Sequence, residues 1–544
     1  DNRIYVTVND VRYSFENGKL IPEKLHGNPV GQWGLAFDDY GRIFYALAGA
    51  EDPGKGFQQN SFYGNLDFKD QLIGDFQEPW PIIATPDVQG GLRRLRTDST
   101  LNHFTAATGQ TIFRGNALPA DLKGDYIVCE PVGRLVRRAK VRNNEGKISL
   151  ENAYHQQEFI ASADMNFRPV NSSTGPDGCL YIVDMYHGII QESNWTREGS
   201  YLRPQILRKG LEKNVGRGRI YRVVSDKIKP SKVKPDLLTA SSAKLVTYLN
   251  HPNGWWRENA QKLLVLRNDK SVVPTLESMV KTSTNQLARI HALWTLSGMQ
   301  SLKKELLVAT FKDADAEVRK TAIWASENFM NAKTNTFILD NLDPLKTDSS
   351  ADVRFQLALS LRFNDSPKAQ SMIKFMLDKF PNNQVMVASA KAYDSALIAE
   401  KQRKEAEKLM NETEQRVINE GATIFKGLCG ACHGMDGKGI ALGANELLAP
   451  ALANNKNVNE KNPQKLIKIL LHGLTGPIDG KTYTANLMPA QSDNDDVYIS
   501  SVLSYIRNDF GNKRGIITPE EVAKIRKITA TRTLPYTMDE LNNK

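Results

Sequence analysis

The chain has 544 residues, with 40% hydrophobic and 24% charged residues and a formal net charge of +10. Such a length excludes a single ordinary core, and the composition is that of a soluble globular protein. No apolar run reaches the length of a membrane-spanning helix. Asp1 leads directly into an apolar stretch typical of a strand, without a visible signal peptide, so we expect a processed or truncated start.

Residues 1–228 are predicted to be all-β, because short apolar strands recur after glycine turns. Turn sequences such as Asp38–Gly41 and Pro176–Gly178 precede several of them. A repeated turn-plus-strand unit favours a β-propeller, with a sandwich as the alternative. Residues 52–89, rich in Gly, Pro, Gln and Asn, are expected to form a long inserted loop. The predicted strands are 41–45, 124–128, 178–183 and 218–221.

Residues 229–400 are predicted to form an α-solenoid. Four arginines, each followed by small and apolar residues at helical spacing, lie 32, 30 and 35 residues apart. That period is close to the period of paired-helix repeats, which bury their apolar faces only by stacking. The set resembles HEAT repeats, with an irregular bundle as the alternative. The charged residues 401–413 are predicted to form a linker helix, and the arginines are Arg257, Arg289, Arg319 and Arg354.

The segment Cys429-Gly430-Ala431-Cys432-His433 has the C-x-x-C-H pattern of a c-type haem attachment site. Two thiols at this spacing can add to the two vinyl groups of one haem, and the adjacent histidine becomes an axial iron ligand. A zinc site is disfavoured because no second cysteine pair exists to complete it. Covalent haem attachment normally happens outside the cytoplasm, so we expect an exported protein of the periplasm or cell envelope.

The elements around this motif resemble a class I cytochrome c domain, placed at 414–515 with a C-terminal tail at 516–544. In that family a methionine in the loop before the last helix is the second axial ligand, and Met488 occupies that place; a core methionine is the alternative. Met435 is too close to His433 to reach the opposite haem face. His472 is expected at the surface. Ser492 is the predicted cap of the last helix, with Asp495 and Asp496 in its first turn.

Two further cysteines and the positive charge leave alternatives open. Cys129 and Cys179 either pair in an oxidising compartment or remain two buried thiols. Residues 414–511 hold nine Lys/Arg and ten Asp/Glu, so the positive charge lies elsewhere, in runs such as 93–96 and 137–140. No aromatic residues interleave these runs, so we expect a solvated face and no nucleic-acid binding, with an acidic redox partner as another possibility.

The β region resembles the propeller of bacterial quinoprotein-type dehydrogenases similar to glucose and sorbosone dehydrogenases, many of which continue into HEAT repeats and a cytochrome c. The resemblance implies pyrroloquinoline quinone, Ca²⁺, and oxidation of a sugar or alcohol whose electrons pass to the haem. A complete six-bladed propeller needs more strands than this region supplies, so we expect an incomplete one. The resembling segments are 31–38, 111–115, 129–135, 167–170 and 175–188.

Such a site needs a general base and cationic groups around the quinone. His103, Arg114, Asp184 and His187 are candidates because they lie at strand ends or in loops, where turn hydrogen bonding is the alternative role. The sequence thus predicts an exported haem protein fed by a built-in dehydrogenase that works with a redox partner protein. The alternative is a non-enzymatic electron-transfer or docking subunit of a larger, membrane-associated complex.

Overall fold

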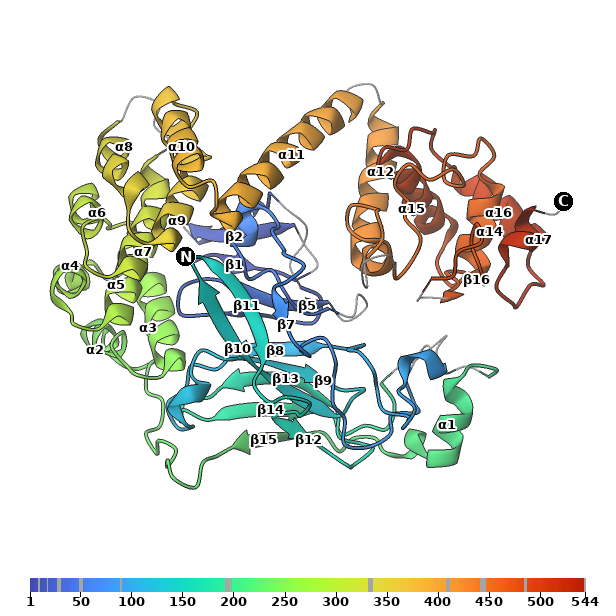
Figure 1. The fold of residues 1–544 in the computed structure, drawn as a ribbon, viewed down its shortest axis with the longest axis horizontal. Coiled ribbons are helices and arrows are strands. Elements are labelled where there is room, and N and C mark those ends of the chain that lie inside the picture. The colour runs from blue at the N-terminus through green and yellow to red at the C-terminus, as the bar shows by residue number, and fades with distance from the viewer. Residues whose placement is uncertain are drawn as a thin grey trace.

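The computed structural model describes residues 1–7, 10–16, 18–26, 31–47, 52–88, 91–190, 196, 198–330, 336–407, 411–440, 447–483 and 487–542. Three regions follow one another along the chain (Figure 1). A β-rich region occupies the centre and lower part of the view, helical repeats flank it on one side, and a C-terminal helical domain lies on the other. The long helix α11 (Gln384–Glu407) leads from the repeats towards the C-terminal domain.

The β-rich region is a series of four open sheets taken in chain order, and its described strands close no barrel. Neighbouring strands are antiparallel, except that β7 runs parallel to β11. The prediction of an all-β region is therefore confirmed at this level. The first sheet contains β1 (Ile4–Tyr5), β2 (Val11–Glu16) and β3 (Lys19–Lys24), and the second β4 (Leu35–Phe37), β5 (Ile43–Leu47) and β6 (Asp52–Lys55). The third has the order β7 (Leu72–Ile73), β11 (Lys147–Asn152), β10 (Leu135–Asn144), β9 (Tyr126–Glu130) and β8 (Thr108–Ile112), with β12 (Ile160–Ala161) on β10, and the fourth contains β13 (Pro169–Thr174), β14 (Leu180–Asp184) and β15 (Arg219–Val223).

The third and fourth sheets approach each other closely at Gly109, where β8 meets β13. A Cβ atom at this position, where φ is +56°, would lie 2.1 Å from the carbonyl oxygen of Val170. Only glycine accepts both the left-handed backbone and this close approach. The loop predicted at 52–89 contains β6 and β7, so part of it belongs to the second and third sheets; Gln89 lies outside the described residues. Shorter helices of this region are η1 (Ser61–Tyr63), η2 (Gly91–Arg94), η3 (Ala120–Leu122), α1 (Leu202–Lys209) and η5 (Leu211–Lys213).

The basic run at 137–140 is not a solvated face, which corrects the prediction. Strand β10 lies between β9 and β11, and Arg137 and Arg138 are both buried. Arg137 donates through Nε to Glu158 at 2.8 Å, and Arg138 donates to Asp125 at 2.5 Å. Buried guanidinium groups need such partners, because an unpaired buried charge costs several kcal/mol. The basic run at 137–140 thus consists largely of buried, paired charges and does not form a ligand-binding surface.

Cys129 and Cys179 are free, buried thiols. The second alternative from the sequence is therefore the one observed. Burial raises the pKa of both, that of Cys179 to about 11, so both are protonated at neutral pH. They behave as small hydrophobic side chains.

The helical repeats confirm the register of the four arginines. Each lies four residues after a residue whose side chain caps its helix: Asn253, Asn285, Asp315 and Ser350. The helices are α2 (Ser242–Tyr248), α3 (Gly254–Arg267), α4 (Val273–Thr282), α5 (Gln286–Gly298), α6 (Lys304–Thr310), α7 (Ala316–Ala325), α8 (Phe337–Leu342), α9 (Ala351–Leu361) and α10 (Pro367–Lys379), followed by α11. The arginines lie in α3, α5, α7 and α9.

The arginines also connect neighbouring repeats. Arg319 donates to the carbonyl of Asp313, six residues back, and binds the carboxylate of Asp348 in the next loop at 2.7 and 2.8 Å. Arg289 pairs with Asp313 at 2.5 Å in the same way. Arg354 donates to the carbonyl of Asp348. The loops at Asp313 and Asp348 are thereby each held by the arginine before them and by the arginine after them.

The repeats pack on the β region through polar contacts between buried groups. Asp39, in the turn between β4 and β5, accepts from Arg257 of α3 at 2.6 Å. The hydroxyl of Tyr63 donates to Glu327 at 2.5 Å. These contacts join residues more than 200 positions apart, and they bring the repeats against the second sheet.

The C-terminal domain begins at α12 (Glu412–Ile424), whose first turn is closed by a capping box between Asn411 and Glu414. The predicted linker at 401–413 is shared between the end of α11 and this cap, and residues 408–410 lie outside the described part. The remaining elements are η9 (Phe425–Cys429, a π-helical turn), α13 (Gly430–His433), α14 (Gln464–His472), β16 (Leu474–Thr475), β17 (Leu487–Met488), α15 (Asp496–Asn508), α16 (Pro519–Ile528) and α17 (Met538–Asn542).

Two expectations for this domain need correction. The side chain of Asp495, not Ser492, caps α15 by accepting from the amide of Tyr498. The segment expected as a tail forms α16 and α17, and Val522 and Ile525 lie in the domain core. No helix in the described ranges is both long and apolar enough to cross a membrane.

Candidate haem site

The attachment motif is placed by a change in helix geometry. After α12 the backbone widens into the π-helical turn η9 and then tightens into α13, which carries Cys432 and His433. Single π turns inside helices occur frequently at functional sites. Cys429 and Cys432 form no disulfide and are half-buried, and they lie with the histidine on one short segment. The pKa of Cys429 is raised to about 12, mainly because the thiol is buried and to a smaller extent because Cys432 is close by.

His433 is oriented by a carbonyl that the motif itself does not contain. Its ring is buried, and Nδ1 lies 2.8 Å from the carbonyl oxygen of Pro450. A carbonyl can only accept, so the proton lies on Nδ1 and the lone pair of Nε2 is available to a metal. Burial lowers the pKa of His433, which favours the neutral ring that binds iron. The contact with Pro450 therefore fixes both the tautomer and the orientation of the His433 ring.

Met435 and Met488 occupy different places in the domain. The Sδ atom of Met435 lies against α13: a Cβ atom built at Gly430 would lie 2.5 Å from it. Met435 therefore packs beside the attachment segment. Met488 ends β17, pairs with Leu474 of β16, and is partly buried against the domain core. Asn486, in the predicted loop before it, lies outside the described residues.

His472 is not a simple surface residue. Its Nε2 lies 2.7 Å from the hydroxyl of Thr529, and its ring meets Tyr536 edge to face at 5.8 Å. It thereby ties α14 to the segment around α16 and α17. Burial lowers its pKa. The contacts indicate a structural role within the domain.

A close crossing of α12 and α15 supports the attachment segment (Figure 1). A Cβ atom at Gly421 would lie 1.9 Å from the carbonyl oxygen of Ser501, so the helices touch backbone to backbone at that point. Next to the crossing, Phe425, Tyr505 and Phe510 form an aromatic cluster with ring centroids 5.0–5.5 Å apart. Its member Phe425 begins the turn η9, which ends at the first cysteine of the motif.

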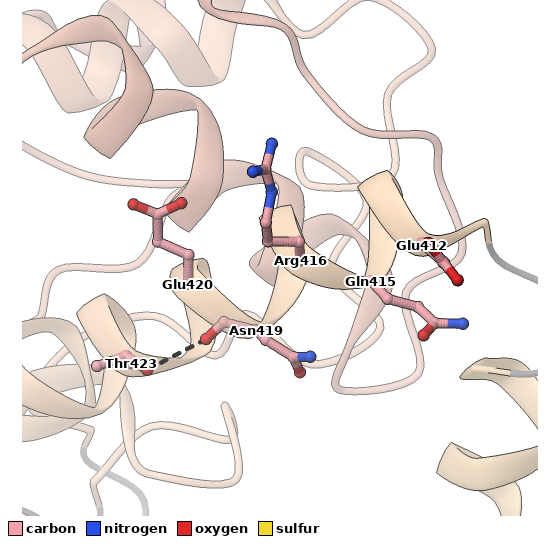
Figure 2. A pocket seen from close by; sticks show the side chains of 6 residues that line it. All are labelled: Glu412, Gln415, Arg416, Asn419, Glu420 and Thr423. Atoms are coloured by element: carbon pink, nitrogen blue, oxygen red, sulfur yellow. Dashed lines mark hydrogen bonds between the residues drawn. The ribbon is translucent and has the colours of Figure 1, made fainter.

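A shallow hollow lies along the polar side of α12 and is separate from the attachment residues. Figure 2 shows its lining side chains, which come from successive turns of the helix. Thr423 donates to the carbonyl of Asn419 at 3.1 Å, and Glu420 lies 3.4 Å from the hydroxyl of Ser501. The lining contains no thiol or imidazole, so the hollow is not the haem site. The lining residues are Glu412, Gln415, Arg416, Asn419, Glu420 and Thr423.

In the β region, the structure brings two of the four candidate residues together. Asp184 accepts from the backbone amides of Arg168 and Tyr186 at 2.7 and 2.8 Å, as in a turn. Its other carboxylate oxygen is buried and has no hydrogen-bond partner within the described chain. The carbonyl of His187 accepts from the Arg168 guanidinium at 3.0 Å, and its Nδ1 lies 2.5 Å from the carbonyl of Ile189.

The other two candidates have separate surroundings. His103 lies 3.2 Å from Arg94 through Nε2. Arg114 pairs with Glu258 of α3 at 2.5 Å and with Asp39 at 3.4 Å, so it belongs to the interface with the repeats. These carboxylates raise its pKa despite burial, and it stays a fixed cation. Its ion pairs account for its placement without a ligand.

A buried charge cluster near Asp184 was missed by sequence reasoning. The carboxylate of Asp87 receives two bonds of 2.9 Å from Arg134 and one of 2.7 Å from Arg168. Its pKa is lowered, because the two guanidinium groups outweigh its burial. Arg168 lies in one of the resembling segments, but nothing in the sequence links it to Asp87. The cluster joins the third sheet to the fourth.

These residues do not assemble the calcium site that the resemblance implies. Within the described ranges, no group of three or more His, Cys, Asp or Glu side chains is placed to hold a metal ion. Arg114 is held in ion pairs and Asp184 in a turn. No reaction step is therefore assigned to a quinone or to calcium. The catalytic roles of the four candidates stay predictions.

Fold and site together define the class of the C-terminal domain: it is a cytochrome c domain that follows HEAT repeats. The cytochrome c family model matches residues 418–509, and the HEAT repeat model matches 242–326. Residues 1–227 match a domain of unknown function (DUF7133). The β region thus corresponds to one domain family, whose model names no activity.

Among curated proteins, the chain is similar to the fructose dehydrogenase cytochrome subunit of Gluconobacter japonicus, with 28% identity over 113 residues. It is also similar to one of the subunits of nicotinate dehydrogenase from Pseudomonas putida, with 32% identity over 94 residues. These matches cover 20% and 17% of this chain. They span 22% of the first relative and 7% of the second, so the likeness is confined to one part of each protein.

Proposed function

We propose that this chain accepts electrons released by the oxidation of a small organic substrate and passes them to an external acceptor through one covalent haem c. Cys429 and Cys432 would attach the haem, and His433 and Met488 would ligate its iron. The observation that carries the proposal is the contact between His433 Nδ1 and the Pro450 carbonyl, which places the ring proton on Nδ1 in a segment whose two cysteines form no disulfide. When bound, the haem supplies reversible one-electron exchange.

The residues of the chain prepare this exchange in three ways. Pro450 fixes the tautomer and the direction of the His433 ring. The cluster of Phe425, Tyr505 and Phe510 and the crossing at Gly421 hold α12 and α15 around the attachment segment. Met488 would contribute a thioether ligand, which would favour the reduced iron and so raise the reduction potential. With His433 and Met488 as its two protein ligands, the iron would exchange electrons without binding substrate.

The electron donor in this proposal is a dehydrogenase. Both curated relatives are named as subunits of dehydrogenases, and one of them is a cytochrome subunit. By analogy, this chain would serve as the electron-accepting subunit of an exported complex, in the periplasm or at a membrane-associated assembly. The sheets and repeats would then dock the redox partner.

The ligand assignment is tested by two methionine variants. In Met488→Ala the haem stays covalently attached, because both cysteines are intact, but the reduction potential falls by on the order of 0.1 V. Met435→Ala is the matched control and leaves the potential unchanged. Spectroelectrochemical titration gives the potential, and intact-mass measurement gives the haem addition. An unchanged potential in Met488→Ala would sink the assignment.

A second candidate places the dehydrogenase within this chain. The four successive sheets are supporting observations, because propeller blades are consecutive antiparallel sheets, and this row would be part of one. The enzyme would then use pyrroloquinoline quinone, with Ca²⁺, to oxidise a sugar or alcohol, at a calcium site that the described residues alone do not assemble. Adding both cofactors and a sugar panel to the oxidised protein tests it. Haem reduction with any sugar supports the second candidate. If the protein is intact and no sugar reduces the haem, the first candidate, an electron-accepting subunit, is favoured.

A further inference from the structure

Residues 215–234, which we call the basic strip, carry a net charge of +6, against +10 for the whole chain. It holds seven Lys/Arg and one acidic residue, Asp226. All seven basic side chains are exposed, and in the described chain Arg222 is the one among them with an ion pair, at 3.4 Å to Asp177. This differs from the run at 137–140, whose arginines are buried and paired. The basic residues are Arg217, Arg219, Arg222, Lys227, Lys229, Lys232 and Lys234.

Exposed aliphatic side chains alternate with these cations. Ile220 and Val233 are 68% and 65% exposed, and Val215 and Val224 are also exposed. Ile220 lies on the outer face of β15, where its register partner Val183 of β14 is exposed as well. Single exposed aliphatic residues are ordinary on protein surfaces, but four of them interleaved with seven cations in one segment are not.

The strip is continuous and lies at the edge of the molecule. Its first half is β15, the edge strand of the fourth sheet, and its second half is an extended segment without regular structure. Both run along the lower border of the view in Figure 1, on the side away from the cytochrome c domain. A surface that approaches from that side meets the strip first.

We propose that the basic strip binds the surface of an anionic lipid bilayer, with its lysines and arginines at the headgroup phosphates and its aliphatic side chains in the interfacial layer. Basic residues near an anionic membrane are attracted individually, and aliphatic side chains add the burial that makes such binding persist. The composition favours lipid over a protein partner: lysine is depleted and aromatic residues are enriched in protein interfaces, whereas the strip has four lysines and one aromatic residue, Tyr221.

The proposal does not depend on the proposed electron transfer, because none of its residues lies in the cytochrome c domain. It also differs from a membrane span, since attachment would be reversible and sensitive to salt. The competing explanation is that charges on β15 only prevent edge-to-edge pairing of the sheet. That explanation predicts no lipid binding and assigns no role to the lysines beyond the strand.

The test is co-sedimentation of the full haem-loaded chain with vesicles of phosphatidylcholine, alone or mixed with phosphatidylglycerol. We expect binding to the mixed vesicles, at least tenfold weaker binding to phosphatidylcholine alone, and weakening by added salt. The fourfold variant Lys227→Glu, Lys229→Glu, Lys232→Glu and Lys234→Glu should lose at least tenfold in affinity. Its charge-matched control replaces four exposed lysines of the repeats by glutamate and should bind as the parent does: Lys262, Lys281, Lys312 and Lys391.

Two further arms separate the lipid from other anions. Val224→Ser with Val233→Ser should weaken vesicle binding, whereas Leu266→Ser, a control at another exposed aliphatic residue, should not. Polyglutamate stands for an acidic protein, and inorganic phosphate for a free anion. Binding to polyglutamate without binding to vesicles would overturn the proposal, and so would release by phosphate beyond that by chloride at equal ionic strength. The proposal would also be overturned if the strip variant and its charge-matched control lost vesicle affinity equally.

Discussion

Lys426 and Asp10 form an ion pair between two regions that are 416 positions apart in the chain, with 2.8 Å between Nζ and Oδ2. Lys426 lies in the π-helical turn that ends at Cys429, and Asp10 lies just before β2. The pair thus joins the haem attachment segment to the first sheet. Both side chains are partly exposed, so the pair contributes little stability by itself. The pair marks a point at which the cytochrome c domain contacts the β region.

This contact predicts a specific zero-length cross-link. A carbodiimide should join Lys426 to Asp10, because an amine and a carboxylate at this separation can form an amide directly. Burial alone would raise the pKa of Asp10, but Lys426 outweighs it and the pKa lies below the ordinary value of 3.8. The carboxylate is therefore ionised at any pH above 3.8, and the pair is lost only as the pH falls through the lowered pKa. Peptide mass spectrometry detects the product.

Asp10→Asn is expected to abolish that cross-link. The exposed pair of Lys374 and Asp378, 2.8 Å apart within α10, serves as the internal control and should react equally in both proteins. If Asp10→Asn left the 10–426 product intact, or if the product never formed while the control pair reacted, the domain contact would be wrong.

Glu327 predicts a pH dependence of the interface between the repeats and the β region. Its carboxylate accepts from Tyr63 and from Ser360, each at 2.5 Å, and burial raises its pKa from 4.5 to about 7. The folded state therefore binds this proton more tightly than the unfolded state. The resulting stability is fully present below pH 4.5 and is lost, by about 1.4 kcal/mol per pH unit, as the pH rises towards 7.

Glu327→Gln keeps an oxygen acceptor for both hydroxyls but cannot ionise. We expect the variant to match the parent near pH 4.5 and to have a higher Tm above pH 7. Thermal unfolding across this pH range measures the difference, and the exposed Glu305→Gln provides the control with no such trend. A Glu327→Gln variant that is less stable than the parent at every pH would show that the group is ionised in the folded protein.

The arginines of the repeats predict a large and local loss of stability. Arg319 makes two bonds to Asp348 and two to carbonyls of the preceding loop, and it is mostly buried. Removal of one partner of a buried pair typically costs about 3–5 kcal/mol. Arg319→Ala should therefore destabilise α7 and α9 by about 3 kcal/mol.

Hydrogen exchange of these two helices measures that loss. Lys374→Ala, which removes an exposed pair from α10, should change exchange by less than about 0.5 kcal/mol. If Arg319→Ala lowers the stability of α7 and α9 as little as the control does, the arginines recur with the repeats but do not stabilise them.

The sequence predicts those features whose causes are local. The haem attachment motif is complete within five residues, and the repeat register follows from an arginine and a cap four residues apart, as at Asn253 and Arg257. The contact of Pro450 with His433 could not be predicted, because a loop residue 17 positions away supplies it. The burial of Arg137 was missed for a similar reason: it depends on flanking strands and on Glu158. Long-range partners decide whether a charge run faces water.

Gly421 predicts that a single methyl group will destabilise the haem domain. Alanine favours helix over glycine by about 1 kcal/mol, so on propensity alone Gly421→Ala in α12 would be stabilising. Its Cβ, however, would lie 1.9 Å from the carbonyl of Ser501 and 2.8 Å from the Cβ of Tyr505. Because the obstacle is a backbone atom, α12 and α15 must separate, and overpacking of this kind costs about 1–3 kcal/mol.

Gly427→Ala is the matched control, since no atom lies within 4 Å of its Cβ position. Thermal unfolding followed by haem absorbance should show a lower Tm for Gly421→Ala and an unchanged or higher one for Gly427→Ala. Equal values for the two variants would exclude a close crossing of the helices.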